Sequence, residues 1–261
     1  MIPVKSGLQH QFWLICSIFL ATNLIVSTLN HIDDTDETYG YYEPLHYLLY
    51  GTGMQTWEYA PQYAIRTYTF LSPFWGAGLV MKSLNLSKLN VFYGMRALLG
   101  SLTAISEASF ISAVYRKFGT TIGAFTFIFI LFSSGILYCS TALLPSAVIM
   151  NLLMIISSLW IEGQYPLTLF FCCISVLWSG WPFIGIVFVP FGLHMLVATY
   201  RSRAHTDIIS GPDTTKLRKK ENHSIFIGVK NVLVLIVYGI CILLVVATSA
   251  AAVDFHMYNR R

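Results

Sequence analysis

One polar stretch, residues 30–68, holds the side chains best suited to chemistry and lies between two apolar segments. It contains six of the chain's twelve acidic residues and a single arginine, Arg66. Asp34 and Asp36 flank Thr35, and side chains at positions i and i+2 point the same way in an extended segment. We therefore expect these two carboxylates to share a site in which one of them acts as a general base.

The rest of the sequence limits the reaction that such a base could serve. It has no glycine-rich phosphate loop, no serine nucleophile elbow and no His or Cys spacing that indicates a metal, so neither a metal nor a cofactor is predicted. A sugar carried on a lipid phosphate suits the site, because phosphate is a competent leaving group and one base can deprotonate the acceptor hydroxyl. Arg66 and Arg96 are candidate cations for the phosphate charge. Arg96 could instead form a buried pair with Glu107 on one helix face.

A solvated loop between two membrane helices is a simpler interpretation of the polar stretch, since loops carry charge at little cost. Its density of Tyr, Trp, His, Pro and Gly exceeds what a connector needs. Four aromatic residues could stack on sugar rings or form an interfacial belt: Tyr41, Tyr42, Trp57 and Tyr59. Residues 43–51 predict a short amphipathic helix on the bilayer surface, with Pro44 in its first turn.

Composition indicates an integral membrane protein. The chain has 261 residues, of which 56% are hydrophobic and 11% charged, with a net charge of +4. A soluble domain carries about 25% charged residues. The small net charge gives no reason to expect a nucleic-acid partner. The five cysteines lie in apolar segments and are interpreted as buried structural thiols rather than as a disulfide framework or a metal site.

Apolar runs predict an all-α polytopic protein, a single transmembrane domain over residues 1–261. The expected helices are 11–29, 67–81, 91–115, 120–137, 146–161, 165–200 with a break at 178–182, and 225–252. The acidic loop is 30–66 and a basic linker is 201–222. Lysine and arginine placement puts Lys5, the 82–88 loop and this linker in the cytosol, and the acidic loop on the other side.

This orientation leaves a parity conflict, because eight full crossings put the basic linker on the wrong side. One apolar segment must fail to cross, and the break at 178–182 makes a re-entrant pair the first choice. Both sequons, at Asn85 and Asn222, fall in loops assigned to the cytosol and are expected to carry no glycan.

The motif DDTDETYGYYEPLHYLLYGTGMQTWEYAPQYAIRTY, residues 33–68, resembles the first luminal loop of a known family. These are the dolichyl-phosphate-mannose-dependent mannosyltransferases of the endoplasmic reticulum, polytopic enzymes of the type C fold in glycosyltransferase family 22. The similarity is greatest to the alpha-1,2-mannosyltransferases of asparagine-linked glycosylation. Weaker similarities follow in FYGMRALLGSLTAISEASF, FSSGILYCSTALLPS, WSGWPF and VDFHMY.

The resemblance implies an inverting transfer of mannose from dolichyl-phosphate-mannose to a dolichol-pyrophosphate-linked oligosaccharide, in a multi-pass protein of the endoplasmic reticulum membrane. Asp36 matches the family's presumed base, Asp34 is the second choice, and Glu37 supports or positions it. The remaining matched positions are candidates for substrate binding: Glu43, Trp57, Glu58, Tyr59 and Arg66. Arg96 is a further candidate, on the ground of its charge rather than of the motif.

Family members are about twice as long, so the chain is expected to lack their C-terminal half. Three alternatives remain open. The chain is an enzyme, either alone or completed by a partner chain; it is a non-catalytic subunit or regulator; or it is a transporter with Arg96 and Glu107 along its path.

Overall fold

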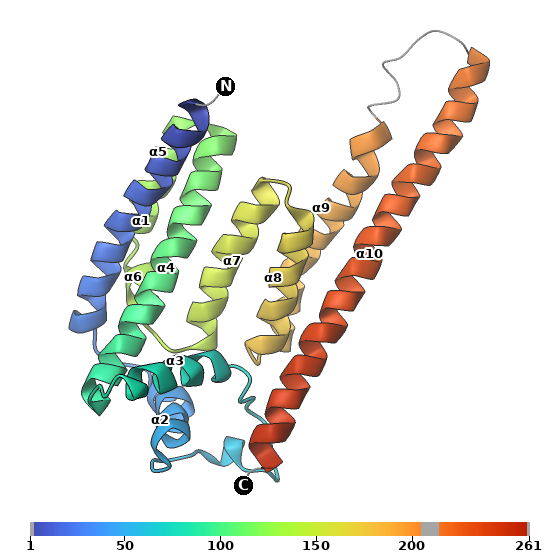
Figure 1. Cartoon of the computed structure of the whole chain (residues 1–261). Helices are drawn as coiled ribbons and strands as arrows, with labels where there is room; N and C mark the ends of the chain where they lie inside the picture. Colours follow the sequence, from blue (N-terminus) through green and yellow to red (C-terminus); the bar gives the residue numbers. More distant parts are fainter. Residues whose placement is uncertain (1–2, 205–213, 260–261) are drawn as a thin grey trace.

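The computed structural model describes residues 3–204 and 214–259, and within these the regular structure is entirely helical (Figure 1). Among these described residues, four helices are long and apolar enough to cross a membrane, at Gln9–Leu29, Lys88–Phe118, Pro182–Tyr200 and Val232–Asn259. Three shorter apolar helices accompany them. The predicted all-α polytopic membrane fold is confirmed.

The upright bundle in Figure 1 consists of α1 (Pro3–Leu29), α4 (Lys88–Phe118), α5 (Thr120–Leu131), α7 (Pro145–Ile161), α8 (Tyr165–Trp178), α9 (Gly185–Ala204) and α10 (Thr214–Asn259). The short α6 (Ser134–Cys139) follows α5. α4 is central, because α1, α5 and α7 all pack on it, and α8 and α9 pack on α10. Phe19 of α1 is fully buried against Ala104 and Ala108 of α4. The small α4 residues let the two backbones approach closely.

A second layer lies across one end of this bundle, which we call the loop end (Figure 1). It consists of the π-helical turn η1 (Glu37–Tyr42), α2 (Glu43–Tyr50), the short η2 (Trp57–Tyr59) and α3 (Ser72–Ser83). Leu45 and Leu49 of α2, Phe74 of α3 and Leu99 of α4 share one apolar core. The helix predicted at Glu43 is confirmed, with its proline in the first turn.

The second predicted crossing, residues 67–81, is wrong. α3 has twelve residues and runs crosswise over the loop end rather than through the bundle (Figure 1). Two bonds hold it beside α2: Lys82 Nζ donates to the Leu49 carbonyl at 2.7 Å, and Trp75 Nε1 donates to the Leu48 carbonyl at 3.3 Å. Twelve residues extend about 18 Å, well short of a bilayer core of about 30 Å.

This correction removes the parity conflict. The 82–88 loop lies at the loop end with the acidic residues, so it cannot share a side with the N-terminus. Arg116 and Lys117, at the end of α4, then lie at the opposite end, where α1 begins and α9 ends. Residues 178–182 form the turn between the antiparallel helices α8 and α9, and α3 is the segment that fails to cross.

The basic linker predicted at 201–222 centres on residues 205–213, which lie outside the described residues. Its flanks are helical, since α9 reaches Ala204 and α10 begins at Thr214. α10 runs back to the loop end, seven residues beyond the predicted 225–252. All five cysteines are free, and Cys16 and Cys172 are buried as expected. Cys241 is exposed on α10, contrary to the prediction for all five.

Candidate active site

A cavity of about 240 Å³ lies at the loop end, between the acidic loop and the turn that joins α8 to α9. Its walls come from segments far apart in the sequence: Asp36, Tyr41, Glu58, Ile65, Arg66, Thr67, Phe70, Ser179, Gly180 and Trp181. Pockets for drug-sized ligands occupy roughly 300–1,000 Å³. This cavity therefore suits a part of a ligand, such as one sugar ring.

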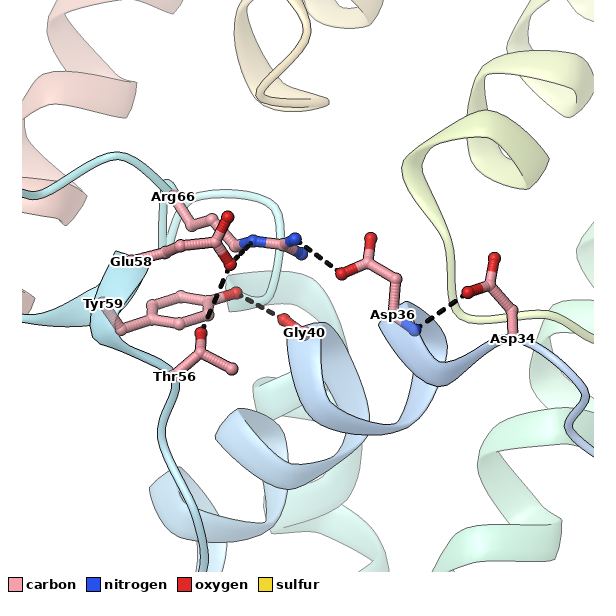
Figure 2. A network of polar contacts seen from close by, with 7 residues as sticks. All are labelled: Asp34, Asp36, Gly40, Thr56, Glu58, Tyr59 and Arg66. Carbon is pink, nitrogen blue, oxygen red and sulfur yellow. Dashed lines mark hydrogen bonds and ion pairs between the residues drawn. The ribbon is translucent and has the colours of Figure 1, made fainter.

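Arg66 joins two carboxylates in the cavity wall (Figure 2). Its Nη2 donates to Asp36 Oδ1 at 2.5 Å and its Nε donates to Glu58 Oε2 at 2.7 Å. Such charge-assisted bonds are short and about twice as strong as neutral ones. The Arg66 side chain is 19% exposed and that of Asp36 is 43% exposed. Asp36 thus has a fixed position while its second oxygen, Oδ2, makes no bond within the described chain.

Asp34 and Asp36 do not share a site, because the segment is helical rather than extended. Asp36 has φ −67° and ψ −36°, and one continuous helical stretch begins at Thr35. Asp34 lies just before it, and its Oδ1 accepts the Asp36 backbone N–H at 2.8 Å, as helix-capping carboxylates do (Figure 2). Asp34 therefore does not line the cavity, whereas Asp36 does.

Two buried tyrosines support the arginine. The Tyr59 hydroxyl donates to the Gly40 carbonyl at 2.8 Å, and the Arg66 guanidinium lies 5.0 Å from the Tyr41 ring centre. Burial raises the pKa of Tyr41 to about 12 and raises that of Tyr59 further. Both are neutral at physiological pH, and their observed contacts include a hydrogen bond from Tyr59 and ring packing of Tyr41 on Arg66.

Glu37 points into the protein rather than into the cavity. Its side chain is buried, and Oε1 accepts the Leu143 backbone N–H at 2.9 Å. Burial raises the pKa of this carboxyl above its usual range, although the Leu143 bond opposes the shift. The contact fastens the start of the acidic loop to the segment before α7, which is consistent with the positioning part of its predicted role.

Arg96 lies away from the cavity and does not pair with Glu107. Its guanidinium donates to the carbonyls of Ser27 and Asn30, each at 3.0 Å, and to Thr141 Oγ1 at 3.1 Å. It thus closes the C-terminal end of α1, where helical carbonyls lack partners. Eleven residues of helix separate Arg96 from Glu107 by about 16 Å, too far for an ion pair.

Glu107 instead accepts from Asn23 Nδ2 at 3.1 Å and is fully buried. Both Arg96 and Glu107 therefore tie α4 to α1 as buried residues, which gives no support to the transporter alternative.

Glu43 and Trp57 lie at the rim of the acidic loop. Glu43 Oε2 accepts the Met54 backbone N–H at 3.0 Å and so holds the turn after α2. Trp57 is 62% exposed and packs edge-on against Tyr63. Neither residue lines the cavity, so their proposed contact with substrate stays a prediction.

The last turns of α10 hold the segment that carries Arg66. The Asp254 carboxylate accepts from Thr67 Oγ1 at 2.7 Å, and from the N–H and hydroxyl of Thr69 at 3.0 and 3.1 Å. The Tyr258 hydroxyl donates to the Arg66 carbonyl at 2.5 Å. Sequence reasoning gave Asp254 and Tyr258 no role; their only signal was the similarity of VDFHMY to the family.

The α8–α9 turn is a second part of the site that sequence reasoning missed. Gly180 has φ +75°, and a Cβ there would lie 2.7 Å from Thr67 Cγ2. Glycine is therefore required both by backbone conformation and by the close approach to the loop. It places Ser179 and Trp181 in the cavity wall, with WSGWPF as the sequence signal.

Residues 3–204 and 214–259 hold no group of three or more His, Cys, Asp or Glu side chains arranged to bind a metal ion. The prediction that neither metal nor cofactor takes part remains a prediction.

The fold and this site together define a polytopic membrane protein that presents a carboxylate–arginine cluster at one end of a helical bundle. Residues 14–261 match the Alg9-like mannosyltransferase family. The chain therefore belongs to that family.

Three relatives show the extent of the similarity. Alpha-1,2-mannosyltransferase Alg9 of Drosophila melanogaster is 37% identical over 196 residues, which cover 75% of this chain and 31% of the relative. The human ALG9 enzyme is 36% identical over 183 residues, covering 70% and 30%. The Saccharomyces cerevisiae ALG9 enzyme is 35% identical over 191 residues, covering 70% and 34%. The chain thus matches about a third of the length of these relatives. No solved structure matches it.

Proposed function

We propose that this chain transfers mannose from dolichyl-phosphate-mannose to a lipid-linked oligosaccharide, forming an alpha-1,2 linkage for protein N-glycosylation. The observation that carries the proposal is the Asp36–Arg66–Glu58 cluster in the cavity wall. It lies within the segment matched to the family, whose named relatives are alpha-1,2-mannosyltransferases.

The proposed reaction is a single displacement at the anomeric carbon. Asp36 Oδ2 takes the proton of the acceptor hydroxyl as that oxygen forms the new bond to C1. The bond from C1 to the phosphate oxygen breaks, and dolichyl phosphate leaves with the bonding electrons. One displacement inverts a beta-linked donor to an alpha-linked product. Proton transfer by a positioned base of this kind contributes about 10²–10⁴-fold in rate.

Arg66 has two roles in this proposal. It holds the Asp36 carboxylate by one oxygen, and it places positive charge in the cavity wall for the leaving phosphate. Glu58 keeps the guanidinium in position but offsets part of its charge. Trp181 offers the cavity an aromatic surface, which suits a sugar ring.

The loop end then faces the lumen of the endoplasmic reticulum, and the opposite end faces the cytosol. Arg116 and Lys117 support this orientation, because lysine and arginine near the ends of membrane helices favour the cytosolic side. The acceptor and the donor are both lipids, so the substrates reach the site from the membrane. The proposal includes a partner chain that completes the site. Complementation, described next, tests whether this chain acts alone.

Complementation of yeast cells that lack their own Alg9-type enzyme tests the function. The readout is the size of the accumulated lipid-linked oligosaccharide. We expect the wild-type chain to restore the longer glycan and the Asp36→Asn variant to fail to restore it. Asp33→Asn is the matched control, since Asp33 pairs with exposed His31 outside the cavity. Failure of the wild-type chain where a full-length relative succeeds would contradict catalysis by this chain alone and favour a non-catalytic role.

A further inference from the structure

A second cavity, of about 300 Å³, lies away from the loop end. It forms where α4 ends, where α7 turns into α8 and where the middle of α9 passes them. Its walls are Lys117, Phe118, Trp160, Ile161, Glu162, Gly163, Tyr165 and His194. None of these residues belongs to the proposed active site, so the cavity needs its own explanation.

Three side chains offer this cavity hydrogen-bond donors. The Lys117 ammonium and the Tyr165 hydroxyl have no partner within the described residues. Trp160 Nε1 donates to His194 Nδ1 at 3.0 Å. An indole N–H can only donate, so His194 Nδ1 must carry the lone pair and the neutral ring keeps its proton on Nε2. His194 Nε2–H is therefore a third donor, held in place by the tryptophan.

The charge at this cavity favours an anion. Glu162 is the acid in its wall, but its carboxylate accepts from Arg116 and, at 3.2 Å, from Gln164 Nε2. Two cations, Arg116 and Lys117, against the single carboxylate of Glu162 leave one net positive charge. A phosphate group carries negative charge and several acceptor oxygens, which suit an ammonium, an N–H and a hydroxyl as donors. A carbohydrate carries no charge and therefore matches this cavity less well.

The surroundings favour a phosphate carried by a lipid over a soluble one. Leu193 and Val197 lie beside His194 on α9 and are 60% and 48% exposed. Phe118, on the other side of the cavity, is 53% exposed. Acyl chains can lie along these apolar surfaces while the head group enters the cavity. Basic pockets between membrane helices on the cytosolic side bind lipid head groups in this way.

We propose that this cavity binds the phosphate head group of an anionic membrane lipid, through Lys117, His194 and Tyr165. It is separate from the proposed transfer of mannose, which takes place at the loop end. Binding here is expected to brace α4, α7, α8 and α9 against one another, since the four helices meet at this cavity.

Lipid binding by the purified full chain, measured by native mass spectrometry, tests the proposal. The probes are dioleoyl phosphatidic acid and dioleoyl phosphatidylcholine, with inorganic phosphate as competitor. We expect phosphatidic acid to be retained in preference to phosphatidylcholine. Lys117→Gln should weaken its retention at least about tenfold, because bonds to charged groups are among the stronger ones. Tyr165→Phe, which removes only a hydroxyl, should weaken it less, and His194→Ala should lie between them.

Lys88→Gln is the matched control, because it removes the same charge at the loop end and should leave retention unchanged. Equal retention of the two lipids by the wild-type chain would overturn the proposal, as would full retention by Lys117→Gln. If inorganic phosphate binds as tightly as phosphatidic acid and depends on Lys117 in the same way, the cavity binds free phosphate. That result would overturn the proposal that a lipid carries the phosphate. None of these results depends on mannose transfer.

Discussion

Asp254, near the end of α10, accepts two hydrogen bonds from Thr69, which lies 185 residues earlier in the chain. The backbone N–H and the hydroxyl of Thr69 both point to the same carboxylate oxygen, Oδ1. The other oxygen receives the Thr67 hydroxyl at 2.7 Å. The last turns of α10 therefore fix the segment that directly follows Arg66, although they take no direct part in the cavity.

Replacing Asp254 should loosen this segment. Asp254→Asn turns one acceptor oxygen into a donor that faces other donors, which we expect to cost about 1–3 kcal/mol of unfolding free energy. Mannose transfer should fall by at least about tenfold, because Arg66 and Asp36 lose their fixed positions. Thermal unfolding and transfer assays on the same preparations measure both. His256→Gln, an exposed change two residues away, is the control. Unchanged transfer in Asp254→Asn would show that α10 does not position the site.

Arg66 should not tolerate replacement by lysine. Arg66→Lys keeps the charge but replaces the planar guanidinium, which bonds Asp36 and Glu58 through two different nitrogens, with a single flexible ammonium. Transfer should fall while the chain still folds. Arg66→Gln should be worse for stability, because it leaves Asp36 and Glu58 facing each other without a cation. Adding Glu58→Gln to Arg66→Gln should recover stability but not transfer. A double variant no more stable than Arg66→Gln would contradict the role assigned to Glu58.

Gly40 should be restricted by the cluster. A Cβ on Gly40 would overlap the Arg66 guanidinium and the Asp36 carboxylate. Gly40→Ala should therefore reduce transfer strongly by separating the ion pair. Gly76→Ala is the matched control, because a Cβ on Gly76 meets no atom within 4 Å and alanine favours the helix. The measurement is the transfer rate of each variant relative to wild type. Equal rates for Gly40→Ala and Gly76→Ala would refute the close packing of Gly40 on Arg66.

Glu37 should make stability depend on pH. Its folded pKa is raised, so the folded state binds this proton more tightly than the unfolded state. Stability from this group is full below the usual glutamate pKa and falls as pH rises toward the raised value. Glu37→Gln keeps an oxygen to accept the Leu143 N–H and carries no charge. It should flatten this fall in a series of unfolding midpoints against pH, and it should retain transfer. Loss of transfer with normal stability would instead mark Glu37 as a catalytic residue.

The orientation can be tested by labelling. Asn85→Cys lies at the loop end, while Gln164→Cys lies in the α7–α8 turn on the opposite side. In sealed microsomes, a membrane-impermeant maleimide should label Gln164→Cys at once and Asn85→Cys only after permeabilisation. The wild-type chain, with its five free cysteines, sets the background. Immediate labelling of Asn85→Cys would reverse the assigned orientation. Because α3 does not cross the membrane, Asn85 lies at the loop end and not in the cytosol. The reason given for expecting no glycan on Asn85 therefore no longer holds.

The helical class and the short helix at Glu43–Tyr50 could be predicted because they depend on local patterns. Apolar length determines spanning helices, and Pro44 marks a helix start. α3 could not be predicted correctly, because its crosswise position depends on contacts from Lys82 and Trp75 to α2. The same limit applies to Asp34 and Asp36, whose relation depends on whether a helix begins at Thr35.

The site was predicted in part for the same reason. Asp36, Glu58 and Arg66 lie in one recognisable loop, and the structure brings them together. Asp254 and Gly180 lie more than a hundred residues from this loop in the sequence and reach it only through tertiary packing. Local sequence spacing cannot predict such contacts. Arg96 was assigned to the site because it is a charge in an apolar helix, but backbone carbonyls of α1 satisfy it instead.

Direct transfer of mannose tests the central claim. Membranes that contain the wild-type chain, Asp36→Asn or Asp33→Asn would be given dolichyl-phosphate-mannose with a labelled sugar and a lipid-linked oligosaccharide acceptor. We expect transfer by the wild type and by Asp33→Asn, and a rate at least about 10²-fold lower for Asp36→Asn. A normal rate in Asp36→Asn would contradict the assignment of the base. Equal loss in both variants would show that the loop needs its overall charge rather than this one carboxylate.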